Sequence, residues 1–134
     1  MTFVLDASVA VAAVRPGEPH HVRSRRLLER VILGPATIVV PSIFAVEVAA
    51  ALVRIGEPAD AIVPLLAALG APPHEVVSIG RARARRAAEI AMRCRLRAAD
   101  AIYVWLAAER QLPLLTLDEE VRLRAAGHCE VRQP

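Results

Sequence analysis

The sequence predicts an α/β fold, a three-layer α/β/α sandwich around a central, mainly parallel sheet. Two observations predict it. Short continuous runs of Val, Ile and Leu alternate with segments of helical periodicity, as happens when helices cover both faces of a parallel sheet. The 134 residues contain no repeat, linker or low-complexity tract and suffice for one hydrophobic core. We therefore expect a single domain over residues 1–134.

The first elements are a strand followed by two helices. The apolar run TFVL at 2–5 predicts a short buried strand, and ASVAVAAV at 7–14 begins a helix directly after it. The segment RPGEP at 15–19 ends that helix, because Pro and Gly interrupt helical structure. Residues 20–33 then place apolar side chains on one side and Arg on the other, which is typical of a surface helix.

The middle of the chain predicts a second strand and two further helices. The run ATIVVP at 36–41 is the strand. Ser42 stands where it caps the apolar helix expected at 43–55. Another helix is expected at 58–70, where Gly70 ends it.

The last part of the chain continues the alternation of strands and helices. Short apolar runs predict strands at 74–80 and 113–117, and an edge strand at 129–133. The intervening segments have helical spacing and predict helices at 81–95, 99–111 and 119–126.

Four acidic residues stand alone in apolar stretches: FVLDASVAV has Asp6, FAVEVAAAL has Glu47, AADAIYVWLAA has Asp100 and LLTLDEEV has Asp118. An ionised carboxylate in an apolar setting is costly unless something pairs with it. Ligands of parallel sheets bind beyond the carboxyl ends of the strands, where Asp6 and Asp118 are expected. Glu47 and Asp100 lie early in neighbouring helices. We therefore expect all four to meet at one site.

Helix capping is the alternative explanation for these acids. Asp is a favoured N-cap, and Asp6, Asp100 and Asp118 each stand where a helix begins. Glu47 does not fit this explanation, because it lies inside an apolar helix. Carboxylates gathered at one place repel each other, and a divalent cation relieves the repulsion. Oxygen ligands without Cys or His suit Mg²⁺, with Mn²⁺ as a substitute.

The basic residues are all Arg, 17 in total, and give a net charge of +3 that favours a polyanionic partner. The stretch RARARRAAEIAMRCRLR holds seven of them. In a helix, Arg86, Arg93 and Arg97 fall along one side and predict a phosphate-binding face. The alternative is a solvated helix face on which Glu89 pairs with Arg85 or Arg93.

The overall composition indicates a partner and no membrane. The chain is 55% hydrophobic but only 3% aromatic, so it leaves apolar surface that a dimer or another protein would cover. The longest uncharged run, 31–46, is too short for a bilayer span and contains two Pro. Two distant Cys predict free thiols. We expect a cytoplasmic protein.

The four acidic segments, in order along the chain, resemble motifs of PIN-domain ribonucleases, most closely the VapC-type toxins of bacterial toxin–antitoxin systems. The resembling pieces are VLDASV, PSIFAVEVAAAL, LRAADAIYVWLA and LLTLDEEV. The resemblance implies a PIN-like fold. It also implies four acids that act as catalytic and metal-binding residues, with two supporting hydroxyls: Asp6, Glu47, Asp100 and Asp118, with Ser8 and Thr116.

The function that this resemblance implies is a Mg²⁺-dependent endoribonuclease, the toxin of a type II toxin–antitoxin pair, which hydrolyses RNA by a metal-activated water. The implied partners are RNA, a cognate antitoxin and a second copy in a homodimer, and the basic stretch becomes an RNA-binding face. An antitoxin Arg that pairs with the carboxylates would displace the metal.

Two alternatives stay open at this point. One is a non-catalytic PIN-like RNA-binding protein. The other is a different Mg²⁺-dependent phosphohydrolase. A hydrolase of the haloacid dehalogenase type would need a second Asp two residues after the first, where this chain has Ser8, and a Lys, which the chain lacks.

Overall fold

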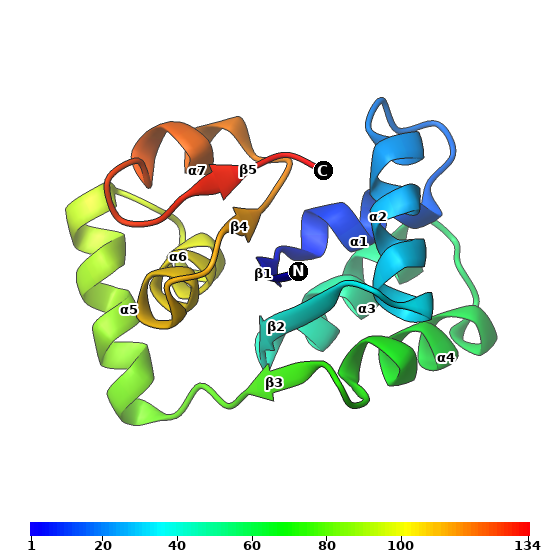
Figure 1. Cartoon of the computed structure of the whole chain (residues 1–134), viewed down its shortest axis with the longest axis horizontal. Helices are drawn as coiled ribbons and strands as arrows, with labels where there is room; N and C mark the ends of the chain where they lie inside the picture. The colour runs from blue at the N-terminus through cyan, green and yellow to red at the C-terminus, as the bar shows by residue number, and fades with distance from the viewer.

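A five-stranded, all-parallel sheet forms the centre of the protein (Figure 1). The computed structural model describes all 134 residues. The strand order across the sheet is β3-β2-β1-β4-β5. The strand bounds are β1 (Thr2–Leu5), β2 (Thr37–Pro41), β3 (Glu75–Val77), β4 (Leu114–Leu115) and β5 (Val131–Arg132). The expected parallel sheet is confirmed.

The first strand lies at the middle of the sheet, between strands from distant parts of the chain. Phe3 pairs with Ile38 of β2, and Val4 pairs with Val39 of β2 on one side and Leu114 of β4 on the other. Each neighbour runs parallel to β1, so the carboxyl ends of β1, β2 and β4 lie at the same edge. The segments that follow these strands carry three of the four acidic motifs.

Seven helices connect the strands and cover the sheet. Helix α6 packs against β1, β2 and β4, and α5 packs on α6. Helices α1 to α4 pack on one another and lie on the other side of the sheet, which gives three layers (Figure 1). The helix bounds are α1 (Ala7–Val14), α2 (His21–Leu33), α3 (Ile43–Arg54), α4 (Ala59–Gly70), α5 (Arg81–Cys94), α6 (Ala98–Arg110) and α7 (Glu119–Arg124).

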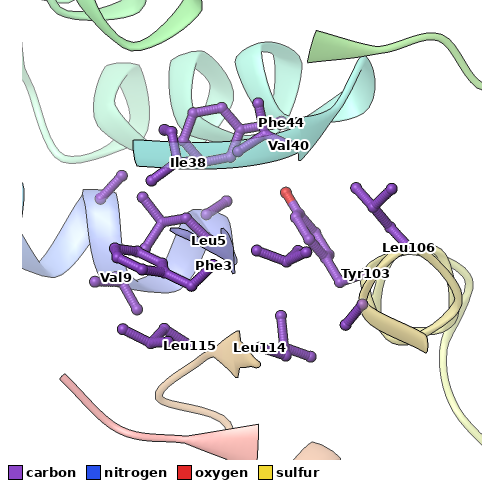
Figure 2. Close-up of a cluster of buried hydrophobic side chains, with 14 of the residues drawn as sticks. Phe3, Leu5, Val9, Ile38, Val40, Phe44, Tyr103, Leu106, Leu114 and Leu115 are labelled. Carbon is purple, nitrogen blue, oxygen red and sulfur yellow. The ribbon is translucent and has the colours of Figure 1, made fainter. Parts of the chain in front are cut away.

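The hydrophobic core joins the central strands to α1, α3 and α6 (Figure 2). Phe3, Leu5 and Ile38 are fully enclosed, and Tyr103 of α6 packs among them. Burial of these apolar surfaces is the main term that favours folding. Because β1 and the start of α1 belong to this core, the residue between them, Asp6, is held in a fixed position.

Several boundaries differ from expectation. The strands expected at 74–80 and 113–117 shrink to three and two residues. Ser42 makes no capping hydrogen bond; instead its hydroxyl accepts one from the Ile79 N–H at 3.1 Å, which ties the end of β2 to the segment after β3.

The basic helix ends earlier than its Arg pattern suggested. Helix α5 stops at Cys94, and Arg95 adopts a left-handed conformation with φ of 54°. Arg97 is therefore not on the helix face of Arg86 and Arg93, and the prediction that the three share one side is wrong. Arg97 is instead the residue before α6.

None of the helices is both long enough and apolar enough to cross a membrane. The two cysteines, Cys94 and Cys129, are free thiols, as expected.

Candidate active site

The four predicted acids line one pocket of about 450 Å³. Asp6 follows β1, and Asp118 lies just beyond β4. Glu47 lies in the second turn of α3, and Asp100 lies in the first turn of α6. The parallel register places the ends of β1 and β4 side by side, so residues from distant parts of the sequence share this edge. Ser8 lies on the same pocket wall.

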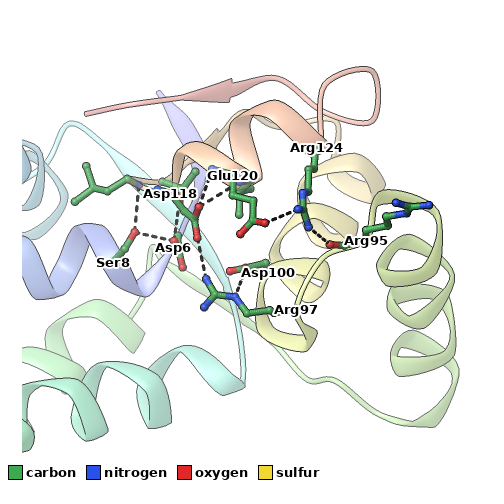
Figure 3. A network of polar contacts seen from close by, with 11 residues as sticks. Asp6, Ser8, Arg95, Arg97, Asp100, Asp118, Glu120 and Arg124 are labelled. Carbon is green, nitrogen blue, oxygen red and sulfur yellow. Dashed lines mark hydrogen bonds and ion pairs between the residues drawn. The ribbon is translucent and has the colours of Figure 1, made fainter.

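Asp6 is held by two hydroxyls (Figure 3). The Ser8 hydroxyl donates to Asp6 Oδ2 at 2.7 Å, and the Thr116 hydroxyl donates to the same oxygen at 2.6 Å. Each hydroxyl also accepts a backbone N–H, Ser8 from Leu117 at 3.2 Å and Thr116 from Asp118 at 3.1 Å. This network joins the start of α1 to the turn after β4 and orients the Asp6 carboxylate.

Helix capping explains only one of the acids. Asp118 caps α7: its Oδ1 accepts the N–H groups of Glu120 at 2.9 Å and Val121 at 3.3 Å. Asp6 occupies the N-cap position of α1, but its side chain makes no capping bond. Asp100 lies inside the first turn of α6, after Arg97 at the cap position. Asp6, Glu47 and Asp100 therefore need another explanation.

Arg97 reaches the pocket and contacts two of the acids (Figure 3). Its Nε donates to Asp100 Oδ2 at 3.3 Å, and its Nη2 donates to Asp118 Oδ2 at 3.1 Å. The sequence predicted that Arg97 would bind RNA from a helix face, whereas in the structure its guanidinium is an ion-pair partner of the acidic site.

Glu47 is held by a residue that the sequence analysis missed. The hydroxyl of Tyr103 donates to Glu47 Oε1 at 2.7 Å. The ring of Tyr103 is buried in the core, as a residue of the AIYVWLAA helix should be. A buried tyrosine hydroxyl needs a partner, and Tyr103 lies three residues after Asp100, on the same side of the helix. That spacing indicates which side of the helix Tyr103 shares, but it does not identify Glu47 as the partner.

Burial and mutual repulsion disfavour the ionised forms of two acids. Burial raises the pKa of Glu47 above its usual value; the Tyr103 hydroxyl opposes the rise, and the charges of Asp6 and Asp100 add to it. Burial also raises the pKa of Asp100, the charge of Asp6 adds to the rise, and Arg97 opposes it. A cation among these groups would relieve both effects.

The donor set fits a hard divalent cation. Asp6, Glu47 and Asp100 each use only one carboxylate oxygen in hydrogen bonds within the protein. The donors are Ser8 and Thr116 for Asp6, Tyr103 for Glu47 and Arg97 for Asp100. Asp6 Oδ1, Glu47 Oε2 and Asp100 Oδ1 have no hydrogen-bond partner in the protein. Oxygen ligands of this kind suit Mg²⁺ or Mn²⁺. As placed, however, no group of three or more acidic, His or Cys side chains stands close enough to hold a metal ion.

Two further charged residues line the pocket, Arg15 and Glu18, in the loop after α1. Arg15 has no carboxylate partner. The RPGEP segment predicts only the end of a helix, and no pattern in it indicates that Arg15 and Glu18 lie beside the acids.

The other arginines predicted to bind RNA lie outside the pocket. Both Arg86 and Arg93 are exposed on α5. Arg86 is 3.8 Å from Glu109 of α6, and Arg93 has no ion-pair partner. Glu89 pairs with neither Arg85 nor Arg93, so the alternative of an internally paired helix face does not describe this helix either.

A family model with the description "PIN domain" matches residues 3–127 of the chain. No curated protein matches the sequence.

Solved structures with the same fold cover nearly the whole chain. VapC20 from Mycobacterium tuberculosis, described as a toxin that cleaves the sarcin–ricin loop, is 20% identical with a TM-score of 0.77, over 98% of this chain and 99% of that one. A chain of a toxin–antitoxin complex from Klebsiella pneumoniae is 18% identical with a TM-score of 0.68, over 98% and 97% of the two chains. A chain of VapBC2 from Rickettsia felis, bound to a promoter DNA fragment, is 13% identical with a TM-score of 0.67, over 100% and 99%. At these identities the likeness establishes the fold.

Proposed function

Because the chain belongs to the PIN domain family, we propose that it is a divalent-metal-dependent endoribonuclease of the VapC type, the toxin of a type II toxin–antitoxin pair. The observation that carries the proposal is the convergence of four carboxylates, from four separate segments, in one pocket. The solved structures of similar fold are described as a toxin and as members of toxin–antitoxin complexes, which supports the same assignment.

Asp6, Glu47, Asp100 and Asp118 are the proposed metal-binding and catalytic residues. These acids would hold Mg²⁺, or Mn²⁺ in its place, and the bound ion would supply an activated water and stabilise negative charge on the phosphate and the leaving oxygen. The chain contains no Lys, and no His lines the pocket. The carboxylates are therefore the groups in the pocket that can accept a proton.

The surrounding residues orient these acids. Ser8 and Thr116 hold one oxygen of Asp6 and leave the other without a protein partner. Tyr103 does the same for Glu47. Such supporting partners fix the direction of a metal ligand, and their loss typically costs roughly 10–100-fold in metal affinity or activity.

The proposed RNA contacts include Arg86 and Arg93 on α5. Both side chains are exposed and add positive charge to a chain of net charge +3. RNA phosphates would bind such a face electrostatically, with a strong dependence on salt concentration.

An antitoxin and a second copy of the chain are the proposed protein partners. Helix α3 presents an open apolar surface on which the side chains of Val46 and Val53 are mostly exposed. Leu33 at the end of α2 is also exposed. Apolar surface of this kind favours burial against a partner.

The test is cleavage of total RNA by the purified chain with Mg²⁺, with Mn²⁺ and with EDTA. Cleavage should occur with either ion and stop with EDTA. The variant Asp6→Asn should be inactive, whereas Glu29→Gln, on the exposed face of α2, should cleave like the wild type. RNA binding without cleavage would favour the non-catalytic alternative, and hydrolysis of a small phosphomonoester but not RNA would favour another phosphohydrolase.

A further inference from the structure

Arg97 occupies a place in the acidic pocket that its sequence context did not indicate. Its guanidinium bridges Asp100 and Asp118 through one oxygen of each, at 3.3 and 3.1 Å. Its side chain is 75% exposed, so no packing holds it in this position. The left-handed Arg95 ends α5 two residues earlier and directs the chain toward the pocket.

The bridge uses oxygens that an ion would need. Asp118 Oδ1 accepts the backbone N–H groups at the N-terminus of α7, and Asp118 Oδ2 accepts a hydrogen bond from Arg97. Neither oxygen is therefore free. Asp100 gives one oxygen to Arg97. In this arrangement the oxygens that Arg97 engages are not available to an ion.

We propose that Arg97 is an internal counter-ion that competes with the divalent cation for Asp100 and Asp118. The guanidinium leaves the two carboxylates when the cation binds and returns when the cation dissociates. This inference rests on the proposed function, since it requires a cation site at these acids.

The energetics favour an exchange of this kind. The four carboxylates repel one another, and Arg97 is the one residue that forms ion pairs with any of them. Exposed ion pairs are weak and easily displaced. A divalent ion carries twice the charge and approaches carboxylate oxygens more closely, so it wins when its concentration is sufficient. Until then, Arg97 holds Asp100 and Asp118 near each other at the expense of cation affinity.

Arg15 provides a matched control. It lines the same pocket and carries the same charge, but it has no carboxylate partner. Replacing Arg15 removes one positive charge from the pocket wall and frees no carboxylate oxygen. Comparing the two variants therefore separates direct competition from a general change in potential.

The experiment is Mn²⁺ binding to the full chain, measured by the loss of the free-ion electron paramagnetic resonance signal and by calorimetry. Arg97→Met should bind Mn²⁺ roughly three- to tenfold more tightly than the wild type, because two ion pairs no longer have to break. Arg15→Met should change the affinity by less than about twofold, because a solvated charge that touches no carboxylate is screened. Arg97→Lys retains the charge but cannot contact both carboxylates through separate nitrogens. Its Mn²⁺ affinity should therefore lie between those of the wild type and Arg97→Met.

The outcomes separate this inference from the proposed function. If the wild type binds Mn²⁺ no more tightly than Asp6→Asn, the cation site itself is wrong and the proposed function fails with it. If the wild type binds Mn²⁺ but Arg97→Met and Arg15→Met bind alike, or Arg97→Met binds more weakly, only the competition is overturned. Should Arg97→Met fail to fold, the Arg97→Lys comparison decides: affinity equal to that of the wild type would refute competition through the bridge.

Discussion

The buried hydroxyl of Thr116 offers a direct measure of how firmly the protein holds Asp6. Thr116 is 2% exposed, donates to Asp6 Oδ2 at 2.6 Å and accepts the Asp118 N–H at 3.1 Å. Thr116→Val keeps the shape of the side chain and removes both bonds. Thr116→Ser keeps the hydroxyl and removes only a methyl group, which makes it the matched control.

The cost of Thr116→Val follows from these contacts. A hydrogen bond to a charged group contributes about 1.5–3 kcal/mol, and an unpaired buried N–H adds a further penalty, so the free energy of unfolding should fall by about 2–4 kcal/mol. Loss of the methyl group in Thr116→Ser should cost about 1 kcal/mol. The difference corresponds to a urea midpoint about 1 M lower for Thr116→Val than for Thr116→Ser.

The assay is urea unfolding at neutral pH with EDTA, followed by circular dichroism, with Mn²⁺ affinity as a second measurement. The affinity of Thr116→Val should fall roughly tenfold or more, because a supporting partner of Asp6 is lost. Equal midpoints and equal Mn²⁺ affinities for Thr116→Val and Thr116→Ser would refute the reasoning, since the hydroxyl would then neither stabilise nor orient Asp6.

Three other expectations concern the same pocket. Tyr103→Phe should weaken Mn²⁺ binding, because Glu47 loses the donor at 2.7 Å; unchanged affinity would contradict this role. Without metal, Glu47→Gln should stabilise the protein at pH 7, because burial and neighbouring charges raise the pKa of Glu47 and its ionised form opposes folding. That gain should vanish as the pH falls through the raised pKa to the usual value of 4.5, which unfolding across pH will test. Asp118→Asn should raise the Mg²⁺ needed for cleavage, whereas Glu119→Gln and Glu120→Gln should do little, because those two lie on the exposed first turn of α7; a larger effect of Glu120→Gln in a Mg²⁺ titration would show that the fourth acid is misassigned.

The order of the strands and helices could be predicted because segments with Pro and Gly separate the apolar runs. A buried apolar run gives β1, and the RPGEP segment ends the helix that follows. The lengths of short strands could not be predicted as well. The run at 113–117 is apolar except for Thr116, whose hydroxyl donates to Asp6 and accepts the Asp118 N–H. The Thr116 backbone N–H still donates to the carbonyl of Arg132 in β5 at 3.1 Å, so the side-chain bonds of Thr116 begin where the pairing with β5 ends.

The position of the acids could be predicted from their apolar surroundings, and the family resemblance indicated the Ser8 and Thr116 hydroxyls that hold Asp6. The positions of Arg97 and Tyr103 could not be predicted. Arg97 reaches the pocket because α5 ends at a left-handed residue, and such an end is usually marked by Gly. Here the residue is Arg95, inside a basic run. The expected end of the helix at 95 is nearly right, but the prediction of a shared face extended helical spacing to Arg97. The spacing of Tyr103 from Asp100 places both on one side of α6, but its partner Glu47 lies on α3, and no local pattern identifies that partner.

The bond between Thr116 and Asp6 also has a consequence for biosynthesis, because it joins residues 110 positions apart. Asp6 leaves the ribosome early, whereas Thr116 and Asp118 emerge late. Until Leu114 and Leu115 pair with β1, Asp6 lacks one of its two hydroxyl donors and the pocket lacks its fourth acid. On the proposed function, a chain still attached to the ribosome therefore has an incomplete nuclease site. Its nuclease site is completed only when the last quarter of the polypeptide has docked.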